Sequence, residues 1–195
     1  MFFLKPAGKG DYQQLLVGGM TSHLSRHKGL LQLERVGPFI PPLCVAGSHL
    51  ILTEAMRSFL ASSPFTDWNV KPVKKAHIVR WEWKKLSDAD NLRGEPEDMI
   101  LSHPHDPDVA ISLGDLYELV LPFGCYVIGY ETSRSITKYD LRCKTIPNGD
   151  LFQVRLPGGT RPMCSRSFRE WIESLDEVRP WIRFLPAKIK LAGNV

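Results

Sequence analysis

Apolar residues recur at strand spacing through the first half of the chain. Residues Leu30–Val36 are apolar and then alternate with polar positions, and His49–Thr53 form a short apolar run. Both are predicted strands. The first run meets the proline-rich residues 37–42, GPFIPP. Since two successive prolines cannot continue a hydrogen-bonded ladder, we expect an edge strand or a crossover there.

A third predicted strand carries an aromatic face. The alternating positions of HIVRWEW on one side are His77, Val79, Trp81 and Trp83. This spacing predicts that the two tryptophans face the core. We expect His77 to be a core histidine whose ring is hydrogen-bonded.

Two segments have helical spacing. Residues 53–63, TEAMRSFLASS, place Met56, Phe59 and Leu60 on one face, and Thr53 can cap the first turn. Residues 165–172, SRSFREWI, repeat the same order of hydroxyl cap, apolar residue, arginine and aromatic–aliphatic pair. A duplicated helix–strand unit around residues 49–85 and 161–190 would explain the match. The ordinary pattern of an amphipathic helix would explain it equally well.

The second half predicts further short elements. Residues 111–131 are apolar and partly aromatic, and we expect a short helix capped by Ser112 followed by a buried strand. ITKYDLRC (136–143) and LFQVRLP (151–157) are strand candidates. The turn PNGD (147–150) joins them, and Asn-Gly favours a two-residue hairpin.

Together these elements predict an α+β fold, with a mainly antiparallel sheet and two or three helices. We expect a single domain over residues 1–195, with or without two related helix–strand halves. A chain of 195 residues buries roughly 70% of its unfolded surface, so it needs neither metal nor disulfide to fold. Its four cysteines are widely spaced, and we expect them to be buried free thiols. No cofactor is expected.

The length and order of the apolar segments predict where the protein is located. No segment approaches the roughly 20 apolar residues that span a bilayer, so no membrane is expected as a partner. The N-terminal MFFLKPAGKGDYQQLL places its charge after a short apolar start, unlike a secretory signal. We therefore expect a cytoplasmic protein.

Charge is divided between two neighbouring blocks. Residues 71–85 hold six basic side chains against Glu82, and residues 86–108 hold seven acidic ones against Arg93. The blocks can neutralise each other, or they can form a polarised docking face. The acidic stretch, residues 87–108, contains three prolines and little periodicity. We expect a long loop there, and long loops in compact domains are often functional.

One cluster in this stretch suggests metal chemistry. His103, His105 and Asp106 lie within the sequence HPHDPD, residues 103–108. Imidazole and carboxylate bind divalent metals, so the cluster could serve a metal-dependent hydrolase. However, no further ligand can be identified, and short loops of this composition are usually solvated. Our main expectation is that the chain holds no metal.

Other chemistry is not indicated. The chain has no G-x-S-x-G elbow, no P-loop and no G-x-G-x-x-G, so we expect no catalytic residues and no enzyme. The basic run 71–85 includes Trp81 and Trp83, which could stack on bases. Since both are predicted to face the core, we expect no nucleic-acid partner.

The order of several motifs suggests a family. GPFIPP, TEAMRSFL, VKKAHIVRWEW, GEPEDMILSHPHDPDVA, GDLYELVLP and CSRSFREWIE follow one another over most of residues 30–186. This order resembles that of bacterial polymorphic-toxin immunity proteins. The resemblance implies a non-enzymatic inhibitor that binds a cognate protein toxin and blocks its active site. A regulatory protein-binding module is the remaining alternative.

The resemblance leaves open where the toxin would bind. Immunity proteins of nucleases are often acidic, whereas this chain has a net charge of +4. The acidic stretch could supply a complementary face locally. We therefore predict that the partner contacts are Glu95, Glu97, Asp98, His105 and Asp106.

Overall fold

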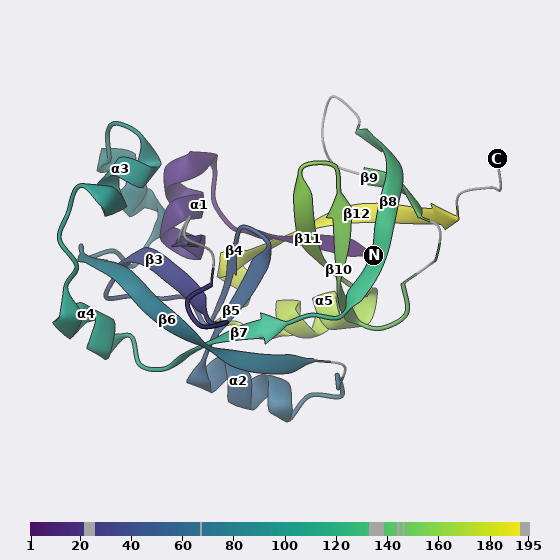
Figure 1. Cartoon of the computed structure of the whole chain (residues 1–195), viewed down its shortest axis with the longest axis horizontal. Helices are drawn as coiled ribbons and strands as arrows, with labels where there is room; N and C mark the ends of the chain where they lie inside the picture. Colours follow the sequence, from purple (N-terminus) through teal and green to yellow (C-terminus); the bar gives the residue numbers. More distant parts are fainter. Residues whose placement is uncertain (22–25, 67, 133–138, 144, 146, 192–195) are drawn as a thin grey trace.

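The chain folds into two sheets that lie side by side (Figure 1). The computed structural model describes residues 1–21, 26–66, 68–132, 139–143, 145 and 147–191. Over these residues the fold is α+β, as predicted. One sheet is a closed barrel and the other is a six-stranded sheet, so the expected plain antiparallel sheet differs from the structure. Alternation in a sequence indicates which face of a strand is buried, but not which neighbours pair with it.

The barrel combines the first strand of the chain with the last five. Its strands are β1 (Phe2–Pro6), β8 (Phe123–Thr132), β9 (Tyr139–Cys143), β10 (Leu151–Leu156), β11 (Gly159–Cys164) and β12 (Ile182–Leu191). Their order around the barrel is β1-β11-β10-β8-β9-β12. The β8–β10 and β9–β12 pairs are parallel, and the other pairs are antiparallel. The N-terminal strand β1 therefore lies between two strands from the C-terminal part of the chain.

The second sheet is formed by the strands between these. They are β2 (Met20–Thr21), β3 (Leu31–Gly37), β4 (Leu43–Ala46), β5 (His49–Thr53), β6 (Asn69–Arg80) and β7 (Leu116–Val120), in the order β2-β3-β6-β7-β5-β4. The predicted strands at 30–36, 49–53 and 77–83 correspond to β3, β5 and the end of β6, although β6 stops at Arg80. GPFIPP is a crossover, because it leads from β3 to β4 at the far edge.

Helices cover both sheets. They are α1 (Gly10–Gly18), α2 (Glu54–Ala61), α3 (Pro96–Leu101), α4 (Pro107–Ser112) and α5 (Arg166–Ser174), with 3₁₀ helices at η1 (Leu86–Asn91) and η2 (Arg179–Trp181). The two predicted helices are confirmed as α2 and α5. The hydroxyls of Thr53 and Ser165 cap them by accepting from Met56 N and Phe168 N. Phe59 is 48% exposed, however, and lies outside the buried face of α2.

The predicted long loop at 87–108 is wrong, because this stretch contains η1, α3 and the start of α4. Pro96 and Pro107 each stand at the first position of a short helix. Proline is suited to that position because its fixed φ is helical and its missing N–H has no partner there anyway. The prolines thus begin helices here. The helix expected to start at Ser112 is also wrong, since Ser112 ends α4 and the strands β7 and β8 follow.

The hairpin predicted at PNGD is replaced by another. Strand β10 pairs with β11 through the two-residue turn Pro157–Gly158, with Leu156 opposite Gly159. Gly158 has a φ of 92°, which favours glycine. Strand β9 pairs with β8 and β12 instead of β10. Residues 136–138 of the predicted strand ITKYDLRC lie outside the described residues.

One core joins the two sheets. It contains Phe2 and Leu4 of β1, Leu50 and Leu52 of β5, and Met56 of α2, together with Phe168 and Ile172 of α5. The rings of Phe65 and Phe168 lie 5.0 Å apart, centroid to centroid. All four cysteines are buried free thiols, as predicted.

The α2 and α5 units have the same topology. In each, the strand before the helix and the strand after it both pair antiparallel with a third strand between them: β7 lies between β5 and β6, and β1 lies between β11 and β12. Both helices lie on the lower side of Figure 1. The duplication remains a prediction, and this shared arrangement is compatible with it.

A buried guanidinium links α1 to the second sheet. Arg35 of β3 is fully buried, and it donates to Leu16 O (2.7 Å) and Phe39 O (3.3 Å). Its positive charge faces the carbonyl end of α1, where the helix dipole is negative. Burial lowers the pKa of Arg35. Because a buried charge is costly unless it is hydrogen-bonded, these carbonyls fix the position of α1 on the sheet.

We expect Arg35→Ala to lower the free energy of unfolding by about 3 kcal/mol, because buried carbonyls lose a charged donor and a cavity forms. Chemical denaturation measures this change. Arg179→Ala is the matched control: its pair with Asp176 is exposed (61% and 86%), so the loss should stay within about 0.5 kcal/mol. Equal losses in the two variants would contradict the role given to Arg35.

Candidate functional site

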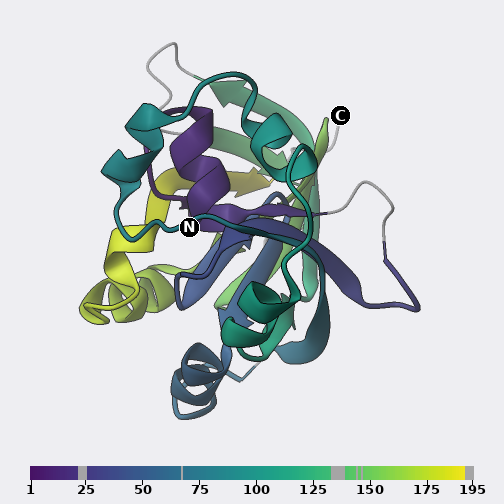
Figure 2. The same cartoon turned by 90° about the vertical axis from the view of Figure 1, so that its left-hand side faces the viewer.

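The acidic segment, defined here as residues 86–114, covers an open edge of β6. Strand β7 pairs only with Asn69–Pro72, whereas β3 pairs with the opposite edge from Val73 to Arg80. This leaves one edge of β6 without a ladder over its second half. Figure 2 shows the acidic segment running around α1 and then on to α4.

The acidic segment satisfies polar groups along that edge. Asp106 N donates to Ile78 O (2.7 Å), and Ile78 N donates to His105 Nδ1 (3.0 Å). Lys75 Nζ donates to the carbonyl oxygens of Ala110 (2.5 Å) and Gly114 (2.9 Å) at the end of α4. An unpaired strand edge is a template for unwanted pairing, so these contacts protect β6 as well as hold the segment.

Two predicted partner contacts are used in this attachment. The Asp106 carboxylate binds Arg80 (Nε to Oδ2, 2.6 Å) and also caps α4 by accepting from Val109 N (3.0 Å). These hydrogen bonds, the one from Arg80 first, lower the pKa of Asp106. His105 accepts from β6, as described above. The Asp106 carboxylate and the His105 ring could therefore bind a partner only if the hydrogen bonds that hold the acidic segment to β6 were broken.

The histidine cluster does not form a metal site among the described residues. Over that part of the chain, no three His, Cys, Asp or Glu side chains come together in a way that could hold a metal ion. His77 is half-buried, and its Nε2 lies 3.0 Å from Ile100 O and 2.8 Å from His103 O. Its ring is thus hydrogen-bonded, as predicted, but the side chain is not part of the core, and it joins β6 to the end of α3.

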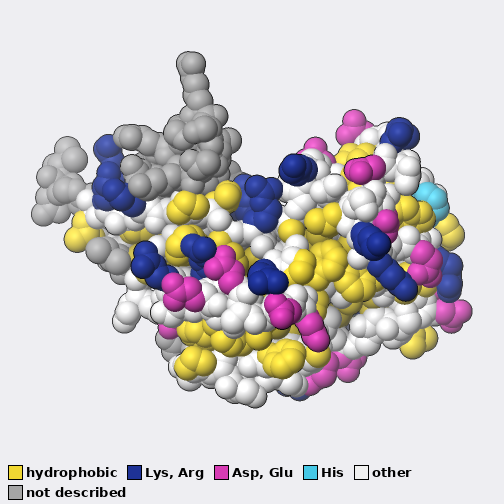
Figure 3. All heavy atoms as spheres, turned by 180° about the vertical axis from the view of Figure 1, so that it is seen from behind, with side chains coloured by type: hydrophobic (Ala, Val, Ile, Leu, Met, Phe, Trp, Pro, Cys, Tyr) yellow, Lys and Arg dark blue, Asp and Glu magenta, His cyan; other side chains and the backbone are white. Residues whose placement is uncertain are grey.

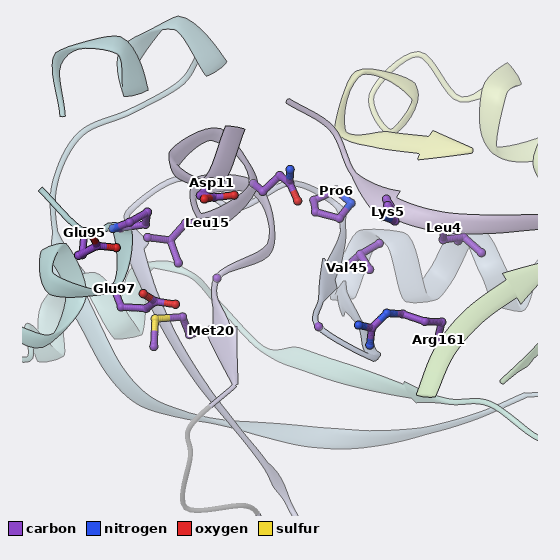
Figure 4. A pocket seen from close by; sticks show the side chains of 14 residues that line it. Leu4, Lys5, Pro6, Asp11, Leu15, Met20, Val45, Glu95, Glu97 and Arg161 are labelled. Carbon is purple, nitrogen blue, oxygen red and sulfur yellow. The ribbon is translucent and has the colours of Figure 1, made fainter. Parts of the chain in front are cut away.

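The other predicted contacts, Glu95, Glu97 and Asp98, are exposed at the start of α3. Glu95 and Glu97 line a cleft of about 410 Å³, where Asp11 of α1 joins them (Figure 4). Tyr12 Oη donates to Gly94 O (2.6 Å), and this bond fastens the turn before α3 to α1. The structure therefore brings two of the five predicted residues into a hollow and adds Asp11, which the sequence did not indicate.

The far end of the cleft is basic. Lys5 of β1 and Arg161 of β11 lie there, opposite the carboxylates in Figure 4. Desolvation, followed by the charges of Arg161 and Arg183, lowers the pKa of Lys5. The apolar side chains of Leu15, Met20, Pro6 and Val45 lie between the two ends, and Leu4 lies beyond Lys5 (Figure 4). From behind, Figure 3 shows a notch in the upper outline with Lys and Arg side chains beside it. The cleft is thus charged at both ends, with opposite signs, and apolar between them.

An ionic cluster around the buried Glu118 of β7 was missed by the sequence analysis. The Glu118 carboxylate is 4% exposed and binds Arg26 through two bonds of 2.5 Å and His49 Nδ1 at 2.9 Å. Burial opposes its ionisation, but the hydrogen bonds from His49 and Arg26 outweigh this and lower the pKa to about 2. The signal was present, since Glu118 stands in the apolar run LYELVLP two residues after Leu116, on the same strand face.

The tryptophans of the basic run are not exposed stacking platforms. Trp83 is 1% exposed and donates from its indole nitrogen to Val36 O (3.1 Å), and Trp81 is half-buried. None of the helices in the described part of the chain is long and apolar enough to cross a membrane.

Comparison of the chain with protein-family models, with curated proteins and with solved structures found no match. The function is therefore inferred from the geometry of this chain.

We expect Glu118→Gln to change the acid stability of the protein. The folded pKa of about 2 lies below the ordinary 4.5, so the ionised carboxylate stabilises the fold above pH 4.5. That stabilisation disappears as the pH falls toward 2 and is worth roughly 2–3 kcal/mol. The variant should be less stable than the wild type at pH 7. Its free energy of unfolding should also change less than that of the wild type between pH 4.5 and pH 2. The measurement is urea denaturation at several pH values.

Glu170→Gln serves as the control, because Glu170 is exposed on α5. It should follow the wild-type pH profile. A Glu118→Gln profile that also parallels the wild type would show that the Arg26–Glu118–His49 cluster contributes no net stabilisation.

Proposed function

We propose that this protein is an immunity protein: it binds a cognate bacterial toxin and thereby blocks the toxin's active site. The binding surface is the cleft with an acidic end at Glu95 and Glu97 and a basic end at Lys5 and Arg161, called the two-signed cleft below. The observation that carries the proposal is the cleft itself, in which Glu95, Glu97 and Asp11 face Lys5 and Arg161 across an apolar lining. An apolar centre within a charged rim is the usual composition of a protein interface.

The carboxylates are held on a supported surface. Helix α3 is attached to α1 through Tyr12 and to β6 through His77, and Ile100 packs in the core beneath it. A partner that binds here has little backbone to order, and preformed surfaces bind more tightly for that reason. This support favours a tight inhibitory complex.

The local charge indicates what the partner presents. The whole chain carries a net charge of +4, yet the exposed start of α3 is acidic. Complementary potentials speed association and exclude wrong partners. The toxin should therefore bring a basic surface to α3, as a nuclease does near its substrate path.

The test is co-expression of the tagged chain with the toxin encoded beside it. We expect a one-to-one complex that abolishes toxicity. The triple variant Glu95→Lys, Glu97→Lys and Asp98→Lys should bind at least about tenfold more weakly, mainly through slower association. Surface plasmon resonance at two salt concentrations measures the association rate.

The matched control makes the same charge change on another face. Glu170→Lys, Asp176→Lys and Glu177→Lys alter exposed positions on and after α5, at the lower side of Figure 1. This variant should bind like the wild type. Equal binding by both triple variants would exclude α3 as the docking surface, and the absence of any complex would exclude the immunity function.

A further inference from the structure

Three exposed basic residues lie in a row across neighbouring strands at one end of the barrel. On the inner face, Phe3 of β1 stands opposite Met163 of β11 and Leu185 of β12, and all three belong to the barrel core. Side chains two residues apart on a strand share a face. The next inward positions on these strands are Lys5, Arg161 and Arg183, with Lys5 directly opposite Arg183. Three basic side chains therefore occupy adjacent strands where the apolar interior ends.

The three cations repel one another. Arg161 and Arg183 each lower the pKa of Lys5 through their charge. Within the described part of the chain, Arg161 donates to Thr160 O (2.9 Å), and Arg183 donates to Gly8 O (3.0 Å), so both bonds end on backbone carbonyls. The ion pairs found among the described residues involve none of the three. A bound anion would relieve this repulsion.

A hollow lies beside two of the three cations, Lys5 and Arg183. It has a volume of about 200 Å³ and is lined by Lys5, Pro6, Gln14, Arg183 and Leu185. Lys5, Pro6 and Gln14 also line the larger cleft, so the two hollows are neighbours. Mouths of β-barrels are common ligand sites, where an apolar floor and a few polar groups fix the orientation of the ligand. Leu185 supplies the floor, and the amide of Gln14 supplies a polar group.

The structure assigns Lys5, Arg161 and Arg183 as the recognition site for a carboxylate on a segment of the partner protein, which then runs along the cleft toward α3. This inference rests on the proposed function in so far as the segment belongs to the partner. Arginine binds carboxylates through two parallel hydrogen bonds, and Arg161 and Arg183 can both contribute.

The acidic residues at the opposite end of the cleft exclude a polyanion as the ligand. Asp11, Glu95 and Glu97 would repel a nucleic acid or polyphosphate laid along the cleft. A peptide segment avoids this repulsion when it carries an acidic residue at the barrel mouth and a basic residue at α3. The cleft therefore selects a segment whose charges are ordered along its length.

The test uses synthetic peptides of about ten residues, which reach roughly 30 Å when extended. One peptide carries glutamates at one end and lysines at the other, and the second has the same composition with the charges scrambled. Fluorescence anisotropy at low salt measures both affinities. We expect the ordered peptide to bind at least about tenfold more tightly, and the double variant Arg161→Glu, Arg183→Glu to lose that preference.

The matched control is Arg155→Glu with Lys188→Glu. It changes the charge of the same barrel equally, but at exposed positions that alternate with the inward residues Val154 and Ala187. This control should keep the preference. Circular dichroism melts verify that both double variants fold. If the variant Arg161→Glu with Arg183→Glu fails to fold, the variant Arg161→Gln with Arg183→Gln replaces it in the same comparison.

Three outcomes overturn the assignment: equal affinity for the two peptides, absence of binding to both, or equal loss in both double variants. Inorganic phosphate is a separate probe. If phosphate binds at these residues, seen as saturable amide shifts that sodium chloride does not reproduce, while the ordered peptide does not bind, the site recognises a small oxyanion. Since no toxin is used, a negative result here combined with an intact toxin complex removes this inference and leaves the proposed function standing.

Discussion

The structure depends on the half-paired edge of β6. This strand is shared between two neighbours that each cover part of it, and the part left by β7 needs hydrogen-bonding partners. The acidic segment supplies them through Asp106 N and the ring of His105. Once the segment is bound there, α3 is placed against α1, and Glu95 and Glu97 face the barrel. The position of the cleft's acidic wall thus follows from an unpaired strand edge some distance away.

The two charged ends of the cleft have different physical origins. The acidic end comes from short helices attached to a sheet edge, whereas the basic end comes from the inward-facing row of a barrel beyond its apolar interior. Strand β1 and helix α1 join them directly in sequence, and Arg35 holds α1 in place through carbonyl oxygens. A shift of α1 would therefore alter both the shape of the cleft and the spacing of its charges.

The sequence predicted individual helices and strands better than it predicted which strands pair with each other. Thr53 and Ser165 correctly predicted where α2 and α5 begin, because helix capping depends on a few adjacent residues. The barrel could not be foreseen, since β1 pairs with strands more than 150 residues away. For the site, charge alone led to the prediction of Glu95 and Glu97, which the structure places in the lining of the cleft. His105 and Asp106 were assigned to a partner because nothing in the sequence shows that β6 lacks a neighbour. Lys5, Arg161 and Arg183 were missed because they lie far apart in the chain.

The position of β1 also bears on how the protein is made. Its neighbours β11 and β12 leave the ribosome more than 150 residues after it does, so β1 remains without these partners until they are made. Folds dominated by such distant contacts close slowly. The basic end of the cleft comes into existence only at barrel closure, which makes it a late product of folding. A nascent chain would thus be unable to engage a ligand through the barrel mouth until translation had passed β12.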